Sequence, residues 1–97
     1  MKFIGCSDEL IRVDIARLFP VIDYITSEVC GRTAIITSTT EGRDIPDEGL
    51  AVDLRILDLP LNVQKRYYFA LNYALRNLCD VAFKPNHIHV EYNPSEY

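Results

Sequence analysis

The sequence predicts an α+β domain in which two main helices flank a small, largely antiparallel sheet. Two long segments carry apolar residues at helical spacing, whereas several shorter segments are β-branched or alternate between apolar and polar residues. Most of the short segments are joined by turns, which favours antiparallel strands. A chain of 97 residues, 48% of them hydrophobic, is expected to form a single domain over residues 1–97.

The first helix is expected over residues 7–31. Ser7 is a candidate N-cap, and apolar residues follow it at helical spacing. Pro20 should kink or restart the helix because proline has no backbone N–H, and Gly31 is a natural stop. The apolar positions are Leu10, Ile11, Ile15, Leu18, Phe19, Ile22, Ile25 and Val29.

Two strands separated by a polar loop are expected next. Residues 33–38, "TAIITS", are β-branched and predict a short strand. Residues 39–49 form the loop, because they contain two glycines, one proline and four acidic residues. Residues 50–56, "LAVDLRI", alternate as a strand does. One face carries Leu50, Val52, Leu54 and Ile56 for the core, and the other carries Ala51, Asp53 and Arg55.

The second helix is predicted over residues 61–80, with Asn62 as its candidate N-cap and one continuous apolar face. A short apolar segment, "VAF", and a turn at "KPN" lead to a final strand over residues 87–92, "HIHVEY". The final strand also alternates, with Ile88, Val90 and Tyr92 on one face and His87, His89 and Glu91 on the other.

Composition argues against several classes of partner. The net charge is −4 and no basic stripe is present, so nucleic acid is a poor candidate. No apolar run approaches the roughly 20 residues that span a bilayer, and the N-terminus does not resemble a signal peptide. We therefore expect a soluble protein that is cytoplasmic as synthesised. The three cysteines lack C-x-x-C spacing, which favours buried thiols in a reducing compartment over disulfides.

Asp53 and the histidine pair form the candidate site. Two strands each have an apolar face and a second face with metal-ligand chemistry, and imidazole nitrogen with carboxylate oxygen suits zinc or iron. Two simpler interpretations stay open. His87, His89 and Glu91 can lie on a solvated strand face without metal, and Asp53 can form an ion pair with Arg55 on its own face.

The segments "GLAVDLR" and "HIHVEY" resemble those of the zinc peptidases that include bacterial D-alanyl-D-alanine carboxypeptidases, phage L-alanyl-D-glutamate endolysins and the hedgehog signalling domain. In the family pattern S-x-H-x-x-G-x-A-x-D, the G-x-A-x-D half is matched by Gly49, Ala51 and Asp53. His89 has the place of the closing zinc ligand, and His87 matches the other histidine of a hedgehog-like H-I-H. The resemblance covers about residues 33–92 and implies a hedgehog/DD-peptidase-like fold.

Two departures from the family pattern concern the reaction itself. Pro46 stands where the first histidine ligand belongs and Asp44 where the serine belongs, so Asp44 or Asp47 is a candidate substitute ligand. No acid occupies the usual place of the catalytic base before the closing histidine, so Asp80 and Glu91 are candidate substitute bases, and His87 and Glu91 are the candidate catalytic residues. By the same resemblance, Arg43 is a candidate for binding a substrate carboxylate.

Two functions follow from this resemblance. The first is a divergent zinc-peptidase-like domain, weak or inactive, whose substrate would be a peptidoglycan stem peptide and whose metal ligands would include Asp53 and His89. The alternative is a pseudoenzyme that binds a protein or peptide partner. The family and the compact single domain also suggest a phage-encoded protein.

Overall fold

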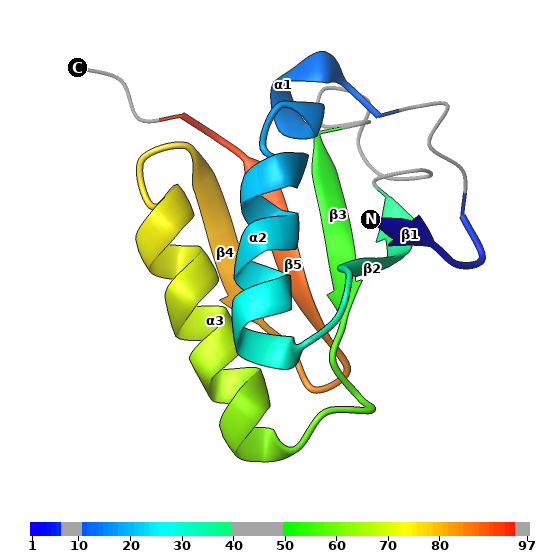
Figure 1. Cartoon of the computed structure of the whole chain (residues 1–97). Coiled ribbons are helices and arrows are strands. Elements are labelled where there is room, and N and C mark those ends of the chain that lie inside the picture. The colour runs from blue at the N-terminus through cyan, green and yellow to red at the C-terminus, as the bar shows by residue number, and fades with distance from the viewer. Residues whose placement is uncertain (7–10, 40–49, 95–97) are drawn as a thin grey trace.

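The computed structural model describes residues 1–6, 11–39 and 50–94, and within them it contains a five-stranded mixed sheet (Figure 1). The strand order is β1-β2-β3-β5-β4, and only the β1–β2 pairing is parallel. The α+β class with a largely antiparallel sheet is therefore confirmed. The strands are β1 (Lys2–Phe3), β2 (Ile35–Thr39), β3 (Ala51–Arg55), β4 (Cys79–Phe83) and β5 (His87–Tyr92).

The first predicted helix is divided into two, α1 (Val13–Ala16) and α2 (Phe19–Cys30). Pro20 lies in the first turn of α2, where its missing N–H breaks no helical hydrogen bond, so it restarts the helix as expected. Gly31 ends α2 with a left-handed φ of 69°, which a residue without a side chain adopts at little cost. The proposed cap Ser7 lies outside the described residues.

The second predicted helix is shorter than expected. Helix α3 spans Leu61–Leu75, and its N-cap is Pro60, so the expectation of Asn62 was wrong. The prediction also extended the helix to Asp80, whereas Cys79 and Asp80 begin strand β4. Cys79 pairs with Tyr92 and Asp80 pairs with Glu91. The helical spacing of apolar residues continues beyond the end of α3. Cys79 and Asp80 are nevertheless part of the sheet, because they pair with β5.

Strand β1 was not predicted, because two residues carry no recognisable pattern. Its parallel partner is the start of β2, with Lys2 opposite Ile35 and Phe3 opposite Ile36. Backbone hydrogen bonds of 2.8 Å and 2.9 Å, from Lys2 N–H to the Ala34 carbonyl and from Ile4 N–H to the Ile36 carbonyl, hold it there. The N-terminal segment therefore completes one edge of the sheet.

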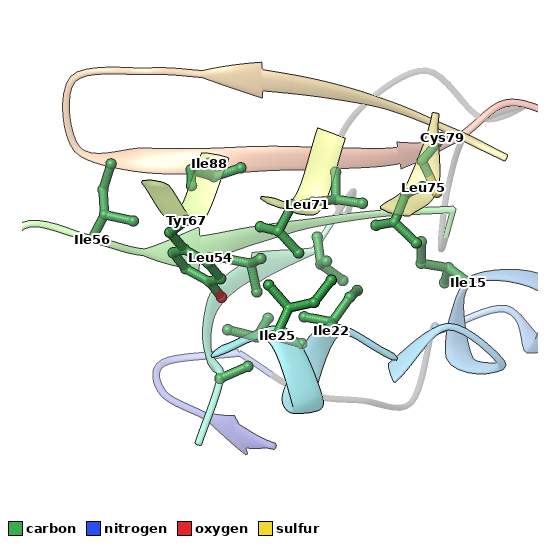
Figure 2. Close-up of a cluster of buried hydrophobic side chains, with 14 residues drawn as sticks. Ile15, Ile22, Ile25, Leu54, Ile56, Tyr67, Leu71, Leu75, Cys79 and Ile88 are labelled. Atoms are coloured by element: carbon green, nitrogen blue, oxygen red, sulfur yellow. The ribbon is translucent and has the colours of Figure 1, made fainter. Parts of the chain in front are cut away.

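Helices α2 and α3 lie side by side over one face of the sheet (Figure 1). Apolar side chains from both helices pack against the sheet there. Figure 2 shows the strand residues Leu54 and Ile88 in the same cluster as the helix side chains. Tyr67 O–H and Thr26 Oγ1 form a buried hydrogen bond of 2.6 Å between α3 and α2. We call this sheet face the core face. Its fully buried strand residues include Ile36, Val52, Leu54, Ile88 and Val90.

The alternation predicted for residues 50–56, which contain strand β3, is confirmed for the core face. Val52, Leu54 and Ile56 are buried, and Leu50 is half-buried just before the strand. Among residues 1–6, 11–39 and 50–94, no helix has the length and apolar character needed to cross a membrane.

Candidate metal centre

Strands β3 and β5 are antiparallel neighbours, and their register brings the candidate residues together. Asp53 lies directly opposite His89, and Arg55 lies opposite His87. Because side chains alternate along a strand, these residues point away from the core face on which Leu54 and Ile88 pack. We call the sheet face that carries Asp53, His87, His89 and Glu91 the histidine face.

Asp53 is the centre of the group. Its Oδ1 lies 2.7 Å from Nδ1 of His89 and 3.6 Å from Nε2 of His87. One ligand atom from each of the three residues lies within 4.8 Å of the other two. The side chains are largely buried, with exposed fractions of 11% for Asp53, 14% for His89 and 24% for His87. A carboxylate this far from water requires polar or cationic partners, and the histidines supply them.

Asn86 fixes the orientation of His87. Nδ1 of His87 donates a hydrogen bond of 2.6 Å to Asn86 Oδ1, since the amide oxygen can only accept. In the neutral ring, Nε2 then carries a lone pair, and this lone pair faces the Asp53 carboxylate oxygen at 3.6 Å. Two acceptors that face each other at this distance are stabilised by a cation between them.

The distance between His87 Nε2 and Asp53 Oδ1 is close to the separation of two ligand atoms around a metal ion such as zinc. Ligand atoms at about 2.0–2.1 Å from a tetrahedral zinc lie about 3.3–3.4 Å apart. The 3.6 Å between His87 Nε2 and Asp53 Oδ1 is close to this value, whereas the 2.7 Å between His89 Nδ1 and Asp53 is a direct hydrogen bond and would have to lengthen. Two imidazole nitrogens and a carboxylate oxygen are also typical zinc ligands. The group can therefore hold a metal ion.

Glu91 contacts the remaining nitrogen of His89. Its Oε1 lies 3.2 Å from His89 Nε2, and its side chain is 31% exposed. Asp80 is the residue opposite Glu91 on β4, but its carboxylate accepts a hydrogen bond of 2.7 Å from Asn93 Nδ2. Of these two carboxylates on neighbouring strands, Glu91 is the one that contacts a histidine of the site.

The alternative of an Asp53–Arg55 ion pair does not apply. The guanidinium of Arg55 lies 4.0 Å from Asp58, which is three residues further along the chain, and the Asp53 partners described above are the two histidines. Of the other sequence candidates, Arg43, Asp44 and Asp47 lie outside the described residues, as does Pro46. His87, a candidate for catalysis in the sequence, also belongs to the group of possible metal ligands. Sequence patterns did not identify Asn86 as part of the site. The available signal is that this polar residue of the "KPN" turn is next to a histidine.

The cysteines Cys30 and Cys79 are not suited to the chemistry of such a site, because their thiols stay protonated. Burial raises the pKa of Cys79 to about 12, with a smaller contribution from the nearby Asp80 carboxylate. Burial also raises the pKa of Cys30. Both are therefore neutral thiols at ordinary pH and are poorly suited to act as nucleophiles or metal ligands.

The fold and the site together define the class of molecule: an α+β domain with an Asp–His–His group, capable of binding a metal, on the sheet face opposite its helices. No protein-family model, curated protein or solved structure matches the chain. The functional assignment therefore rests on the chemistry of this group and on the sequence motifs that carry it.

Proposed function

We propose that this protein is a divergent zinc-peptidase-like domain that binds zinc through Asp53, His87 and His89 and cleaves peptide bonds weakly or not at all. The observation that carries the proposal is the convergence of three ligand atoms within 4.8 Å of one another on adjacent strands. Three protein ligands are the number found in catalytic zinc sites, in which the fourth position is left for water or substrate.

His87 supports the proposal by supplying the ligand that the motif lacks. The family pattern places its first histidine where this chain has Pro46, which has no ligating atom. His87 Nε2 lies 3.6 Å from Asp53 Oδ1, so a third ligand is available from strand β5 itself. The proposal includes the hedgehog/DD-peptidase-like fold and a peptidoglycan stem peptide as substrate, both supported by the "GLAVDLR" and "HIHVEY" segments.

Low activity is proposed because the Glu91 carboxylate is not placed as a general base. Zinc supplies Lewis acidity toward a peptide carbonyl and toward water, but hydrolysis also requires a base. Of the two candidate bases from the sequence, Asp80 accepts a hydrogen bond from Asn93, and Oε1 of Glu91 lies 3.2 Å from His89 Nε2. In this position Glu91 orients a ligand, which is a different role from accepting a proton from water.

Zinc content tests the proposal directly. We expect about one zinc ion per chain when the protein is purified without chelator. The variants Asp53→Asn, His87→Ala and His89→Ala should each lose it, whereas Asp80→Asn should keep it, because Asp80 contacts Asn93 rather than a histidine. Absence of zinc from the unmodified protein, or its retention in all three site variants, would contradict the proposal. Cleavage of a stem peptide by the zinc-loaded protein then measures the remaining activity.

A second candidate function is binding of an acidic protein segment, and one feature of α3 favours it. The outward face of the helix carries Leu61, Phe69 and Tyr73, which are 59%, 65% and 70% exposed. Exposed Lys65 lies among them, and Arg76 lies 4.3 Å from the centre of the Tyr73 ring. Aromatic and arginine side chains dominate the energetics of protein interfaces.

Charge selects the kind of partner for this helix face. Residues 59–79 contain three basic residues and no acidic one, although the whole chain has 14 acidic and 10 basic residues. This local excess of positive charge is complementary to an acidic segment that also carries apolar side chains. Three charges are fewer than the six to ten phosphate contacts of a typical nucleic-acid binder, so a protein segment is the better match.

A glutamate-rich peptide with one phenylalanine serves as the probe for this second function. We expect it to shift the backbone amide resonances of α3, and Phe69→Ser should weaken binding at least about fivefold. Tyr24→Ser is the matched control, because Tyr24 is 66% exposed on the other long helix. Equal weakening by both variants, or stronger shifts with single-stranded DNA or anionic vesicles, would rule out an acidic protein segment as the ligand.

A further inference from the structure

His87 and His89 present different ring nitrogens to the same carboxylate. The two residues are separated by one position on β5 and point to the same sheet face. His89 faces Asp53 with Nδ1 at 2.7 Å, and His87 faces it with Nε2 at 3.6 Å. His89 therefore faces Asp53 with the ring nitrogen nearer its backbone, whereas His87 faces it with the ring nitrogen farther from its backbone.

Strand geometry explains why the nitrogens differ. His89 is directly opposite Asp53 in the β3–β5 register, whereas His87 is opposite Arg55 and reaches Asp53 along the diagonal. Side chains directly opposite each other start about 5 Å apart at Cβ, but diagonal neighbours start about 7–8 Å apart. The near nitrogen is sufficient for His89, and only the far nitrogen of His87 reaches the same point.

Each histidine also has a second polar partner on its own strand or turn. Asn86 Oδ1 accepts a hydrogen bond from His87 Nδ1 at 2.6 Å. Glu91 Oε1 lies 3.2 Å from His89 Nε2 and can accept from it. Asn86 holds the proton of a neutral His87 ring on Nδ1, so Nε2 is the nitrogen left to bind a metal ion. Both nitrogens of His89 face a carboxylate; Nδ1 is the one beside Asp53 and the ligand group, and Glu91 is the acceptor for the proton on Nε2 once Nδ1 binds a metal.

We propose that Asn86 and Glu91 are positioning residues that make His87 bind zinc through Nε2 and His89 bind it through Nδ1. This inference rests on the proposed zinc function and adds the ligand atoms and the residues that select them. Zinc bound at Nδ1 of His89 would displace the proton between His89 and Asp53 to solvent, and the neutral ring would then carry its single proton on Nε2, toward Glu91.

Long-range ¹⁵N spectra of the imidazoles test the assignment of atoms. In the zinc-loaded protein, we expect the metal-bound shift at Nε2 of His87 and at Nδ1 of His89. In the metal-free protein, a neutral His87 ring should carry its proton on Nδ1, because Asn86 Oδ1 accepts from that nitrogen. Asn86→Ala should shift the His87 proton toward Nε2, and Asn86→Asp, which keeps an acceptor, should restore it. Binding through the same nitrogen in both rings would overturn the inference.

Zinc affinity, measured by competition with a chelator, provides the second readout. Asn86→Ala and Glu91→Ala should each weaken binding by about 10- to 100-fold, the usual effect of losing a partner of a ligand. Asn86→Asp and Glu91→Gln should recover most of this loss because both retain an acceptor oxygen. Asp80→Asn controls for charge alone, since Asp80 is opposite Glu91 but contacts Asn93.

The outcomes separate this inference from the proposed function. If the unmodified protein binds no zinc, the proposed function fails, whereas the metal-free His87 spectrum still tests the role of Asn86. If zinc binds and Asn86→Ala and Glu91→Ala bind it as tightly as the unmodified protein, only the positioning role fails. An equal loss in Asp80→Asn would show that net charge, and not orientation of the rings, controls affinity.

Discussion

Leu54 and Asp53 are consecutive residues of β3, yet they point to opposite faces of the sheet and meet opposite environments. Leu54 is fully buried on the core face among side chains from both long helices (Figure 2). The whole Asp53 residue, backbone included, is almost as inaccessible, at 8% exposure, but its neighbours are the two histidines of β5. Burial stabilises the leucine by removing apolar area from water, whereas burial of the carboxylate costs free energy unless partners compensate. Burial therefore stabilises the fold on the core face, whereas on the histidine face it holds a carboxylate and two imidazoles together in a site that can bind a ligand.

Leu71→Ala should produce the largest loss of stability, because it acts on the core face. Leu71 of α3 is fully buried in the core, and truncation leaves a cavity between the helix and the sheet. We expect the free energy of unfolding to fall by about 3 kcal/mol, measured by urea denaturation. Phe69→Ala on the exposed face of the same helix should change it by less than about 0.5 kcal/mol. Equal losses in both variants would contradict the assignment of the core.

Asp53→Asn should have its effect on the histidine face and only in the presence of zinc. Zinc at about 100 times its dissociation constant raises the free energy of unfolding by about 2.7 kcal/mol in a protein that binds it only when folded. Asp53→Asn should abolish this gain while changing the metal-free stability much less than Leu71→Ala does. The measurement is urea denaturation with and without zinc. A zinc-dependent gain of the same size in the variant would contradict the role of Asp53.

The contrast between the faces explains which parts of the fold were predictable from sequence. Alternation assigned Val52, Leu54 and Ile56 to the core, and the structure confirms it. The same rule placed Asp53 and His89 together on the other face, although adjacency of their strands was an additional assumption. Strand β1 was missed because a two-residue strand exists only through its pairing with β2. The end of α3 was misplaced because strand pairing, which is a long-range interaction, outweighs local helical spacing.

The site was predictable only to the level of residues. Sequence patterns identified Asp53, His87 and His89, but they proposed His87 for catalysis only, and its place beside Asp53 in the group of possible ligands came from the structure. Which ring nitrogen faces Asp53 depends on strand register and on the hydrogen bonds of Asn86 and Glu91. These are distances of a few ångströms across the sheet, and no spacing within one segment encodes them.

High pH should weaken the core face through two buried groups. Burial raises the pKa of Cys79 from 9.0 to about 12 and also raises that of Tyr67 above its ordinary value of 10.0. Both groups are neutral when protonated, so the unfolded chain releases its protons first as the pH rises. The contribution of these two groups to stability should therefore be constant below about pH 9, and stability should then fall by about 1.4 kcal/mol per pH unit for each group that has ionised only in the unfolded chain.

Urea denaturation between about pH 8 and about pH 11 measures this slope. Cys79→Ala should flatten it from about pH 9, and Tyr67→Phe should flatten it from about pH 10. Tyr24→Phe should leave the slope unchanged, because Tyr24 is 66% exposed. A slope that is insensitive to both core variants would show that other groups control alkaline unfolding.

The smallest expected effect concerns the contacts of Arg32 at the C-terminal end of strand β3. Arg32 follows the C-cap of α2, donates a hydrogen bond of 2.9 Å to the Arg55 carbonyl and forms a salt bridge with Asp58. The hydrogen bond from Arg32 lowers the pKa of the Asp58 carboxyl below its ordinary value of 3.8. This contribution to stability is complete above about pH 4 and is lost as the pH falls through the lowered pKa.

Because the Asp58 side chain is 44% exposed, solvent screens the pair and its contribution should stay below about 1 kcal/mol. A double-mutant cycle with Arg32→Gln and Asp58→Asn, measured by urea denaturation at about pH 7 and about pH 3, isolates it. The coupling energy should be favourable at the higher pH and smaller at the lower one. A coupling energy of zero at both pH values would mean that Arg32 stabilises this junction through the Arg55 carbonyl alone. The end of β3 would then depend on a backbone contact, and neither face of the strand would require the ion pair.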